Sequence, residues 1–464
     1  MATSASFFTQ LAERVRAVSP AWRWAIGVFL VARVLYTLWG IVVLLLVPNV
    51  SQNLDLFGVP ILAYFDVATG ERYAYSRYVN ARVLTFRASG DATLIDNETS
   101  SVWSLREGVA IGGALAGAKL QTAQYSAEEI FPYRGVAPER GWFGVWQRFD
   151  ALWYQAIAER GYGATVGDIH FPPLYPLLES ILGRILGGRF FLAGWLISQV
   201  ALVWSLALLF RITERWRDAS TAKRAVIFTV LFPTAFFFFT AYSESLFLLL
   251  TLWYFDALRR AHWLWAGFFV FLAMLTRLQG VALCVPLAFC VWDSCRVSKK
   301  ISFAQIMMLL LPILAGAFYL FLRAVAGEGN VLPTSEPQLY ARLAPPWDNL
   351  VYAIQTIASG NFLLADVLNL FVTALAFFVL LRGWQSLPTS LALYSGATLL
   401  IVMLRYVETQ PLNSMTRYVL TLFPLWMLLA HWSKNRWVER AVVYVCAPLN
   451  LYLTAQFLVW GWVA

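Results

Sequence analysis

The most constraining feature of this chain is a series of long apolar blocks, of which the first runs from about Ala25 to Val47. A helix that crosses the hydrocarbon core of a bilayer needs about 20 apolar residues. The strands of a transmembrane barrel would show alternating hydrophobicity over about ten residues instead. Because 60% of the 464 residues are hydrophobic and only 13% are charged, the sequence predicts an all-α polytopic membrane protein and excludes a soluble globular enzyme.

Basic residues between the apolar blocks orient the predicted helices. Short linkers at 211–224, 259–260, 296–300 and 434–440 are rich in Lys and Arg, and the positive-inside rule places them in the cytoplasm with the N-terminus. This also accounts for the net charge of +9 without a nucleic-acid partner. We expect about 11 transmembrane helices, near residues 24–47, 190–210, 225–242, 243–258, 262–276, 278–292, 303–323, 362–381, 389–405, 416–432 and 440–461.

One further apolar stretch, 172–188, is not counted as a span. Counting it would move the basic linker at 211–224 to the outside, against the positive-inside rule. It also contains Pro172, Pro173 and Pro176. We therefore expect a re-entrant or interfacial helix there, which is tolerated when it is buried in protein.

Segment 48–170 contains 13 of the 26 acidic side chains and differs from the rest of the chain. Residues 61–79 and 81–95 each have the pattern of a strand, a turn and a strand, with turns at Thr69-Gly70 and Gly90-Asp91. The sequence predicts a small extracytoplasmic α+β insert between the first two helices. We divide the chain into 1–47 (cytoplasmic N-terminus and first helix), 48–147 (insert), 148–189 (juxtamembrane loop and re-entrant segment) and 190–464 (transmembrane helical domain).

The juxtamembrane region begins with a candidate acidic residue, Asp150. Phe149, Leu152, Trp153 and Ile157 share one helical face, which predicts an amphipathic helix over 150–160 on the outer leaflet. Asp150 stands at its start, where an aspartate often caps free N–H groups. The alternative is a functional carboxylate at the membrane surface.

Glu244 is a second candidate, because it lies between two apolar blocks. A carboxylate at membrane depth is costly unless it is paired or faces water. The functional interpretation is a site residue, and the structural one is a turn residue that reaches the outer headgroups.

Three arginines, Arg277, Arg405 and Arg417, are predicted at the outer ends of spans, where the positive-inside rule disfavours them. Anionic headgroups or pairing with Glu244 or Glu408 would be a structural explanation. Binding of a lipid phosphate is the functional one, because a guanidinium offers planar, bidentate donors. The three histidines have no metal-ligand spacing, and the chain has no Gly-rich phosphate loop.

Several segments together resemble a known family. These are FDALWYQAIAERGY from Phe149, FPPLYPLL from Phe171, FPTAFFFFTAYSESLF from Phe232, TRLQG from Thr276 and MTRYVLTLFPLW from Met415. In this combination the chain resembles the PIG-V-like mannosyltransferases, which belong to the GT-C membrane glycosyltransferases. The resemblance runs from about Arg148 to the C-terminus. Phe149 stands where that family usually has tryptophan, and the segment 48–145 is larger than the family's.

The resemblance implies a membrane glycosyltransferase that moves a sugar, mannose in that family, from a polyprenyl phosphate to an extracytoplasmic acceptor hydroxyl on a lipid or glycan, with inversion. Asp150 is implied as the general base, and Arg277 and Arg417, with Arg405 as a further candidate, as ligands of the donor phosphate. Glu244, Tyr242, Asp168 and His170 are implied as acceptor-binding or structural residues. No cofactor is implied, and a divalent cation at Glu244 is left open.

Two other functions remain open from the sequence. A flippase or transporter of lipid-linked sugars would also be polytopic and basic, but its carboxylates would follow a transmembrane path. A non-catalytic assembly subunit would tolerate changes at Asp150 and Glu244. Sugars other than mannose stay open within the enzyme class. The expected location is a prokaryotic cell membrane, or the endoplasmic reticulum membrane in a eukaryote, with the site on the extracytoplasmic side.

Overall fold

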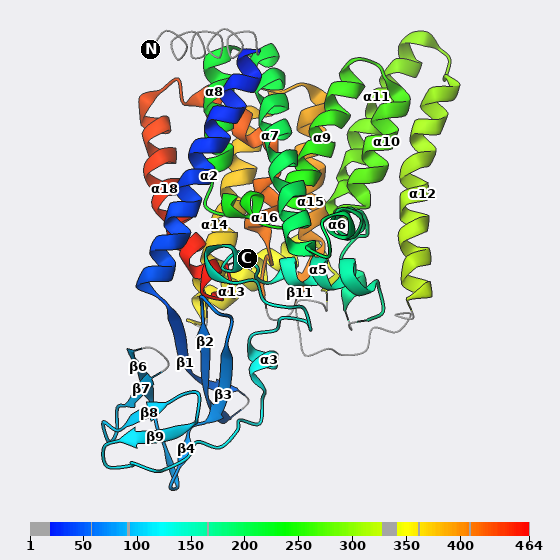
Figure 1. Cartoon of the computed structure of the whole chain (residues 1–464). Helices are drawn as coiled ribbons and strands as arrows, with labels where there is room; N and C mark the ends of the chain where they lie inside the picture. The colour runs from blue at the N-terminus through cyan, green and yellow to red at the C-terminus, as the bar shows by residue number, and fades with distance from the viewer. Residues whose placement is uncertain are drawn as a thin grey trace, which may run out of the picture. The chain divides into compact units, whose positions relative to one another are not determined.

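The computed structural model describes residues 19–56, 58–90, 93–164, 167–326, 341–360, 362–407 and 410–463. The chain forms two compact units. The described residues of the first fall within Met1–Val34, Ile157–Leu453 and Val463–Ala464. The second contains Leu35–Ala156 and Thr454–Trp462. Helices make up most of the first unit, and the strands β1–β9 lie in the second (Figure 1).

Six helical stretches in the described residues are long and apolar enough to cross a membrane, so the chain is a multi-pass membrane protein. In two of the six, an α-helix and a 3₁₀ helix follow each other without a gap. The six are α2 (Pro20–Leu46), α7 (Phe190–Trp216), η3 with α11 (Leu278–Leu283 and Cys284–Ser298), α12 (Phe303–Val325), α14 with η5 (Leu364–Gly383 and Trp384–Ser386) and α18 (Arg436–Leu458).

The other helices of the first unit are shorter than a full crossing requires. The count of eleven crossings therefore stays a prediction. The apolar stretch 172–188, for which we expect a re-entrant or interfacial helix and not a span, contains α6. The 12 residues of α6 reach only about 18 Å, which agrees with its omission from the predicted spans. The remaining helices are α6 (Leu174–Ile185), α8 (Ala219–Leu231), α9 (Glu244–Arg259), α10 (Trp263–Met274), α13 (Pro346–Ala358), α15 (Thr389–Met403), α16 (Met415–Leu420) and α17 (Phe423–Trp432), with the short 3₁₀ turns η1 (Asp168–His170) and η2 (Ala235–Phe239).

The segment expected to span the membrane near 225–242 is not a continuous helix. Helix α8 ends at Leu231 because Pro233 has no N–H to donate and restricts the residue before it. The chain then passes through η2 and reaches α9 at Glu244. Every residue from Pro233 to Ser245 is buried. Irregular backbone in a membrane protein has to be enclosed in this way, since lipid cannot hydrogen-bond its polar groups.

Side chains from neighbouring helices bind the carbonyl groups that this break exposes. Asn450 Nδ2 donates to Phe232 O at 2.7 Å, and Arg33 Nη1 donates to Phe239 O at 2.8 Å. Ser245 Oγ donates to Phe238 O at 3.0 Å. Three separate side chains thus replace the missing helical bonds, which fixes the shape of the break.

The second unit is built on antiparallel sheets around a core that contains Leu62, Phe86, Leu94 and Trp103. Sheet β1-β2-β3 and sheet β6-β7-β8-β9 hold the two predicted hairpins, β2-β3 and β6-β7, and both pairings are confirmed. Asp91, at the second turn, lies outside the described residues. The elements are β1 (Asn49–Leu56), β2 (Val59–Asp66), β3 (Arg72–Ser76), β4 (Tyr78–Val79), β5 (Arg82–Val83), β6 (Phe86–Gly90), β7 (Thr93–Asp96), β8 (Val102–Ser104), β9 (Val109–Gly112), α3 (Ala127–Ile130) and α4 (Gly141–Gly144).

Asp96 organises one end of the four-stranded sheet from a fully buried position. It accepts hydrogen bonds from Trp103 Nε1 at 2.9 Å, from the Thr99 backbone and hydroxyl, and from Ser101 N at 3.1 Å. Burial alone would raise the pKa of this carboxyl, but these hydrogen bonds together lower the pKa below its ordinary value. The ionised carboxylate therefore stabilises the fold of the second unit.

Helix α5 (Asp150–Arg160) forms where it was predicted, but its environment differs from the prediction. The amphipathic interpretation assumed one exposed face, whereas every side chain from Ala151 to Ala158 is buried. The exposed apolar-polar division that the amphipathic interpretation requires is therefore absent over residues 151–158. The sequence pattern does not reveal this, because Tyr154 and Gln155 look like exposed polar positions.

Candidate functional site

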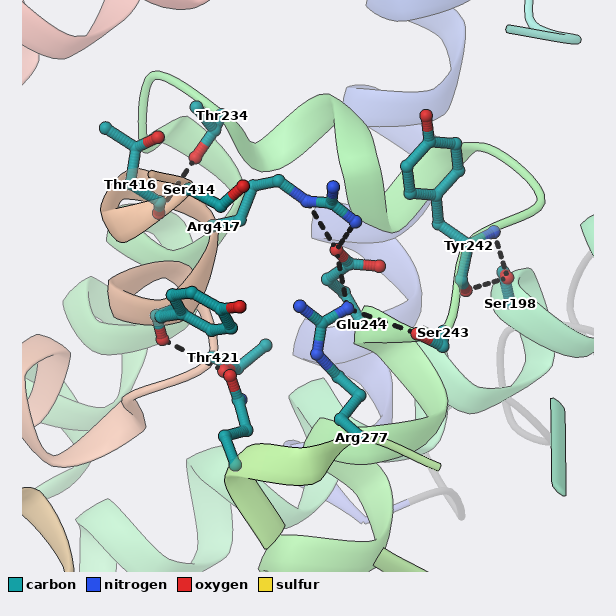
Figure 2. A network of polar contacts seen from close by, with 12 residues as sticks. Ser198, Thr234, Tyr242, Ser243, Glu244, Arg277, Ser414, Thr416, Arg417 and Thr421 are labelled. Atoms are coloured by element: carbon teal, nitrogen blue, oxygen red, sulfur yellow. Dashed lines mark hydrogen bonds and ion pairs between the residues drawn. The ribbon is translucent and has the colours of Figure 1, made fainter. Parts of the chain in front are cut away.

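Glu244 is the centre of a buried ion cluster in the first unit (Figure 2). Its side chain is fully buried. A single carboxylate oxygen, Oε1, accepts from Arg417 Nε at 2.9 Å and Arg417 Nη2 at 2.6 Å. The same oxygen forms an ion pair with Arg277 Nη1 at 2.8 Å. Figure 2 shows the two guanidinium groups approaching Glu244 from different sides. The proposed pairing of these arginines with Glu244 is thus present.

Taken by themselves, the three charged side chains of the cluster carry more positive than negative charge. Two guanidinium groups and one carboxylate give a formal charge of +1, and the side chains of Arg277 and Arg417 are only 10% and 9% exposed. Glu244 Oε2 has no hydrogen-bond partner among the described residues. A buried excess charge is costly unless something compensates it. A bound anion would supply that compensation, and guanidinium donors suit phosphate or carboxylate groups.

Aromatic rings hold the two arginines. The Cζ atom of Arg417 lies 4.6 Å from the ring centroid of Phe237 and 5.2 Å from that of Tyr242. The Cζ atom of Arg277 lies 5.7 Å from the Tyr418 ring. A ring face attracts a cation and restricts its motion. The guanidinium groups are therefore fixed before any ligand arrives.

Each residue of the cluster comes from a place where a helix is interrupted. Glu244 is the first residue of α9 after the break that begins at Phe232. Arg277 lies in extended backbone between α10 and η3. Arg417 belongs to the short helix α16, which ends just before α17. All three charged side chains therefore come from helix ends or from the backbone between helices, and none comes from the middle of a long helix.

Hydrogen bonds join these three breaks to one another. Gln279 Nε2 donates to Thr421 Oγ1 at 2.7 Å. Thr234 Oγ1 donates to Thr416 O at 3.2 Å, as Figure 2 shows. Arg277 Nη1 also donates to Ser243 Oγ at 3.1 Å. The breaks therefore form one connected framework around the carboxylate.

Tyr242, predicted to be an acceptor-binding or structural residue, is fully buried beside the cluster. Its backbone carbonyl accepts from Ser198 Oγ at 2.8 Å, which ties it to α7. Its ring contributes to the environment of Arg417. The contacts support a structural role for Tyr242 at this site.

Arg405 has a different setting from the other two arginines. It lies in β11 (Arg405–Val407), which pairs with β10 (Ala341–Leu343). Its Nη1 donates to Asn413 Oδ1 at 2.6 Å, and Ser414 Oγ donates to the same oxygen at 3.2 Å. Ser414 is the residue before α16, so Arg405 supports the turn that leads to Arg417. Glu408 lies outside the described residues.

Asp168 and His170 belong to η1, in the loop between α5 and α6. Asp168 Oδ2 accepts from Gly163 N at 2.9 Å, and His170 Nδ1 lies 3.0 Å from Gly167 O. Tyr319 of α12 donates to Ile169 O at 2.8 Å. These contacts close and anchor the loop. Among the described residues, no group of three or more His, Cys, Asp or Glu side chains is arranged to hold a metal ion.

Asp150 belongs to the second unit and is the first residue of α5. It is half-buried, and Arg134 lies near it. The Cζ atom of Arg134 is 4.0 Å from the Trp153 ring centroid. Burial lowers the pKa of Arg134 to about 10. The negative charges of Glu128 and Asp150 act in the opposite direction and raise this pKa. Asp150 thus has a cationic neighbour at the N-terminus of a helix.

Sequence reasoning gave no individual role to the rings of Phe237 and Tyr418 or to the bracing residues Gln279 and Thr421, although all four lie within the segments that carry the family resemblance. The signal that could have found them is proximity to a helix interruption, since all four lie within a few residues of one. An apolar cavity of about 290 Å³ was also missed. It is lined by residues of α5, α6 and α12 and by Leu275, which directly follows α10; Leu174 and Leu177 are among the α6 residues.

Comparison with known proteins gives only distant structural likenesses. No protein-family model and no curated protein matches the sequence. A crystal structure of an Archaeoglobus fulgidus oligosaccharyltransferase with zinc and sulfate aligns with 62% of this chain and 44% of its own, at 14% identity and a TM-score of 0.35. The archaeal oligosaccharyltransferase AglB from the same organism, in complex with an inhibitory peptide and a dolichol-phosphate, aligns with 62% of this chain and 47% of its own, at 12% identity and a TM-score of 0.35. The chain spans about half the length of these proteins, and likenesses of this strength assign neither a fold family nor an activity.

Proposed function

We propose that this protein is a GT-C type membrane glycosyltransferase of the PIG-V-like kind. It transfers mannose from a polyprenyl-phosphate carrier to an acceptor hydroxyl on the extracytoplasmic side. The observation that carries the proposal is the buried Arg277–Glu244–Arg417 cluster with its formal charge of +1. A site of this charge inside an apolar protein is complementary to a phosphate group attached to a lipid.

The arginines would act on the leaving group. The acceptor oxygen attacks the anomeric carbon as the bond from that carbon to the phosphate oxygen breaks, and the phosphate leaves with the electron pair. Its negative charge grows during this step. Fixed cations in a water-poor environment lower the barrier by stabilising that charge, typically by several kcal/mol. The rings that hold Arg277 and Arg417 keep the donors fixed, so little reorganisation is needed.

Glu244 has the role of holding both arginines in this scheme. Without it, the two guanidinium groups would repel each other in a medium of low dielectric. With it, they converge on one oxygen while the site keeps one positive charge for the donor phosphate. This arrangement supports the structural alternative for Glu244 and accounts for its position at the start of α9.

Asp150 would take the proton from the acceptor hydroxyl. A carboxylate can serve as a general base when it lies within hydrogen-bond reach of the proton that it removes. Attack from the side opposite to the leaving phosphate inverts the anomeric centre. Leu275, which lines the apolar cavity, is two positions before Arg277 in the sequence. The apolar lining of this cavity suits an isoprenoid chain.

The test is sugar transfer by the purified protein in lipid nanodiscs, with radiolabelled polyprenyl-phosphate-mannose and a panel of lipid and glycan acceptors. Asp150→Asn and Arg417→Lys should each lower kcat at least 100-fold. The matched control is Arg215→Lys, because Arg215 forms its ion pair with Asp256 at the other ends of α7 and α9. It should keep kcat within twofold.

The outcome also separates the alternatives. Movement of the lipid-linked sugar across the bilayer without transfer would identify a flippase. Unchanged transfer in Asp150→Asn would remove Asp150 from the role of base. Transfer of another sugar with equal kcat/KM would overturn the assignment to mannose.

A further inference from the structure

We propose that Arg148 is a positioning residue, which aims Asp150 by fixing the turn before α5 against the C-terminal segment 457–462. This inference rests on the proposed function, in which Asp150 is the base. All the residues that carry it belong to the second unit.

Arg148 is fully buried and joins two distant parts of the chain. Its Nε donates to Leu458 O, the last residue of α18, at 3.1 Å. Its Nη1 donates to Gly144 O at 2.9 Å and lies 3.2 Å from Tyr133 Oη. The guanidinium therefore links the end of α18 to the segment that precedes α5.

Aromatic rings enclose the same guanidinium. Its Cζ atom lies 5.0 Å from the Phe65 ring centroid and 5.2 Å from the Trp460 ring centroid. The rings of Phe65, Tyr133 and Trp460 also contact one another, with centroids 5.5–6.3 Å apart. A guanidinium that lies over two rings and also donates several hydrogen bonds suits arginine better than lysine, whose ammonium is a compact point charge.

The next residue, Phe149, has a strained backbone. Its φ of +49° lies in the left-handed region, which costs an aromatic residue about 1–3 kcal/mol. Its ring packs against Phe457, Trp460 and Trp462 at centroid distances of 5.8, 5.4 and 5.6 Å. The C-terminal rings thus stabilise a conformation that Phe149 would otherwise leave.

The turn sets the direction of Asp150 because it forms the first hydrogen bonds of α5. Ala151 N donates to Arg148 O at 3.2 Å, and Leu152 N donates to Phe149 O at 3.0 Å. Asp150 lies between these bonds. If the turn relaxed, φ of Phe149 would move out of the left-handed region and the carboxylate would rotate away from its position.

The test compares Arg148→Lys with Arg77→Lys in the full-length protein in nanodiscs. Arg77 is a matched control, since it is also buried and its guanidinium donates to the carbonyl groups of Leu54 and Leu84. Two readouts are needed: kcat and KM for polyprenyl-phosphate-mannose, and hydrogen exchange of the peptide that contains the amides of residues 151 and 152.

Arg148→Lys should lower kcat at least 10-fold, leave KM within twofold and speed exchange at residues 151–152 at least 10-fold. Arg77→Lys should change none of these more than twofold. If Arg148→Lys does not fold, Trp460→Leu tests the same contact from the aromatic side, with an expected loss in kcat of about threefold. A wild-type exchange rate at residues 151–152 in the folded variant, or an equal loss in the control, overturns the positioning role.

Asp150→Asn distinguishes this failure from that of the proposed function. It should abolish transfer while exchange at residues 151–152 stays as in the wild type. If Asp150→Asn remains active, the base role fails and the positioning role fails with it. If Asp150→Asn is inactive and Arg148→Lys keeps its kcat, only the positioning role is overturned.

Discussion

Replacing Glu244 with glutamine removes the negative charge on which two buried guanidinium groups converge. The substitution keeps the size of the side chain and leaves one amide oxygen that can accept a hydrogen bond. It leaves a formal charge of +2 where the wild-type cluster has +1. Removing one partner from a buried ion pair typically costs about 3–5 kcal/mol, because the remaining charge has no compensation. We expect Glu244→Gln to destabilise the protein by that amount.

Glu179 provides a matched control. It is a glutamate of α6 that is also fully buried, but no described residue hydrogen-bonds its carboxylate oxygens. Glu179 packs directly against Gly194: a Cβ atom added to that glycine would lie only 2.9 Å from Glu179 Oε2. Replacing Glu179 with glutamine removes no ion pair. We therefore expect Glu179→Gln to lower the free energy of unfolding by less than Glu244→Gln does.

The assay is thermal unfolding of the purified protein in detergent, followed by tryptophan fluorescence. At about 2 °C per kcal/mol, Glu244→Gln should lower the midpoint by about 6–10 °C. Polyprenyl phosphate should restore part of this loss by supplying an anion, up to about 2.7 kcal/mol at a hundredfold excess over its Kd. Equal midpoints for Glu244→Gln and Glu179→Gln would refute the reasoning about the cluster.

Three further predictions concern the fold. The depressed pKa of Asp96 means that its contribution to stability is present above its ordinary pKa and is lost as the pH falls through the lower, folded-state value. Acid should therefore lower the hydrogen-exchange protection factors of strand β7 below about pH 4 in the wild type, relative to the chemical exchange rate at each pH, and Asp96→Asn should remove this pH dependence of protection. Gly267→Ala should destabilise the protein by about 1–3 kcal/mol, because its Cβ would lie 2.7 Å from the backbone of Met308, whereas Gly316→Ala, with open space around it, should be neutral or stabilising in the same thermal assay. Cysteine labelling in intact cells or sealed vesicles should find residues 60–140 outside and Arg217 inside, and the reverse labelling would invert the proposed side of the site.

The sequence alone determined that the chain is a multi-pass membrane protein, and it located the long apolar helices and two hairpins. Apolar blocks of sufficient length predicted the helices, since burial of backbone polar groups leaves a helix as the simple way to cross a bilayer. Period-two patterns with Gly-containing turns predicted the hairpins of the insert. Glu244, Arg277 and Arg417 could each be singled out, because charge is expensive at membrane depth.

Only the tertiary structure decided how these residues meet. Arg417 and Glu244 are 173 positions apart, and no local pattern indicates that both arginines share one carboxylate oxygen. The break at Pro233 ends α8 early, and the side chains of residues 151–158 in α5 are all buried although the sequence pattern predicts an exposed face. Hydrophobic periodicity indicates which residues avoid water. The ion pairs of Glu244 with Arg277 and Arg417 depend instead on where the interrupted helices end in space. Packing between segments far apart in sequence sets those positions.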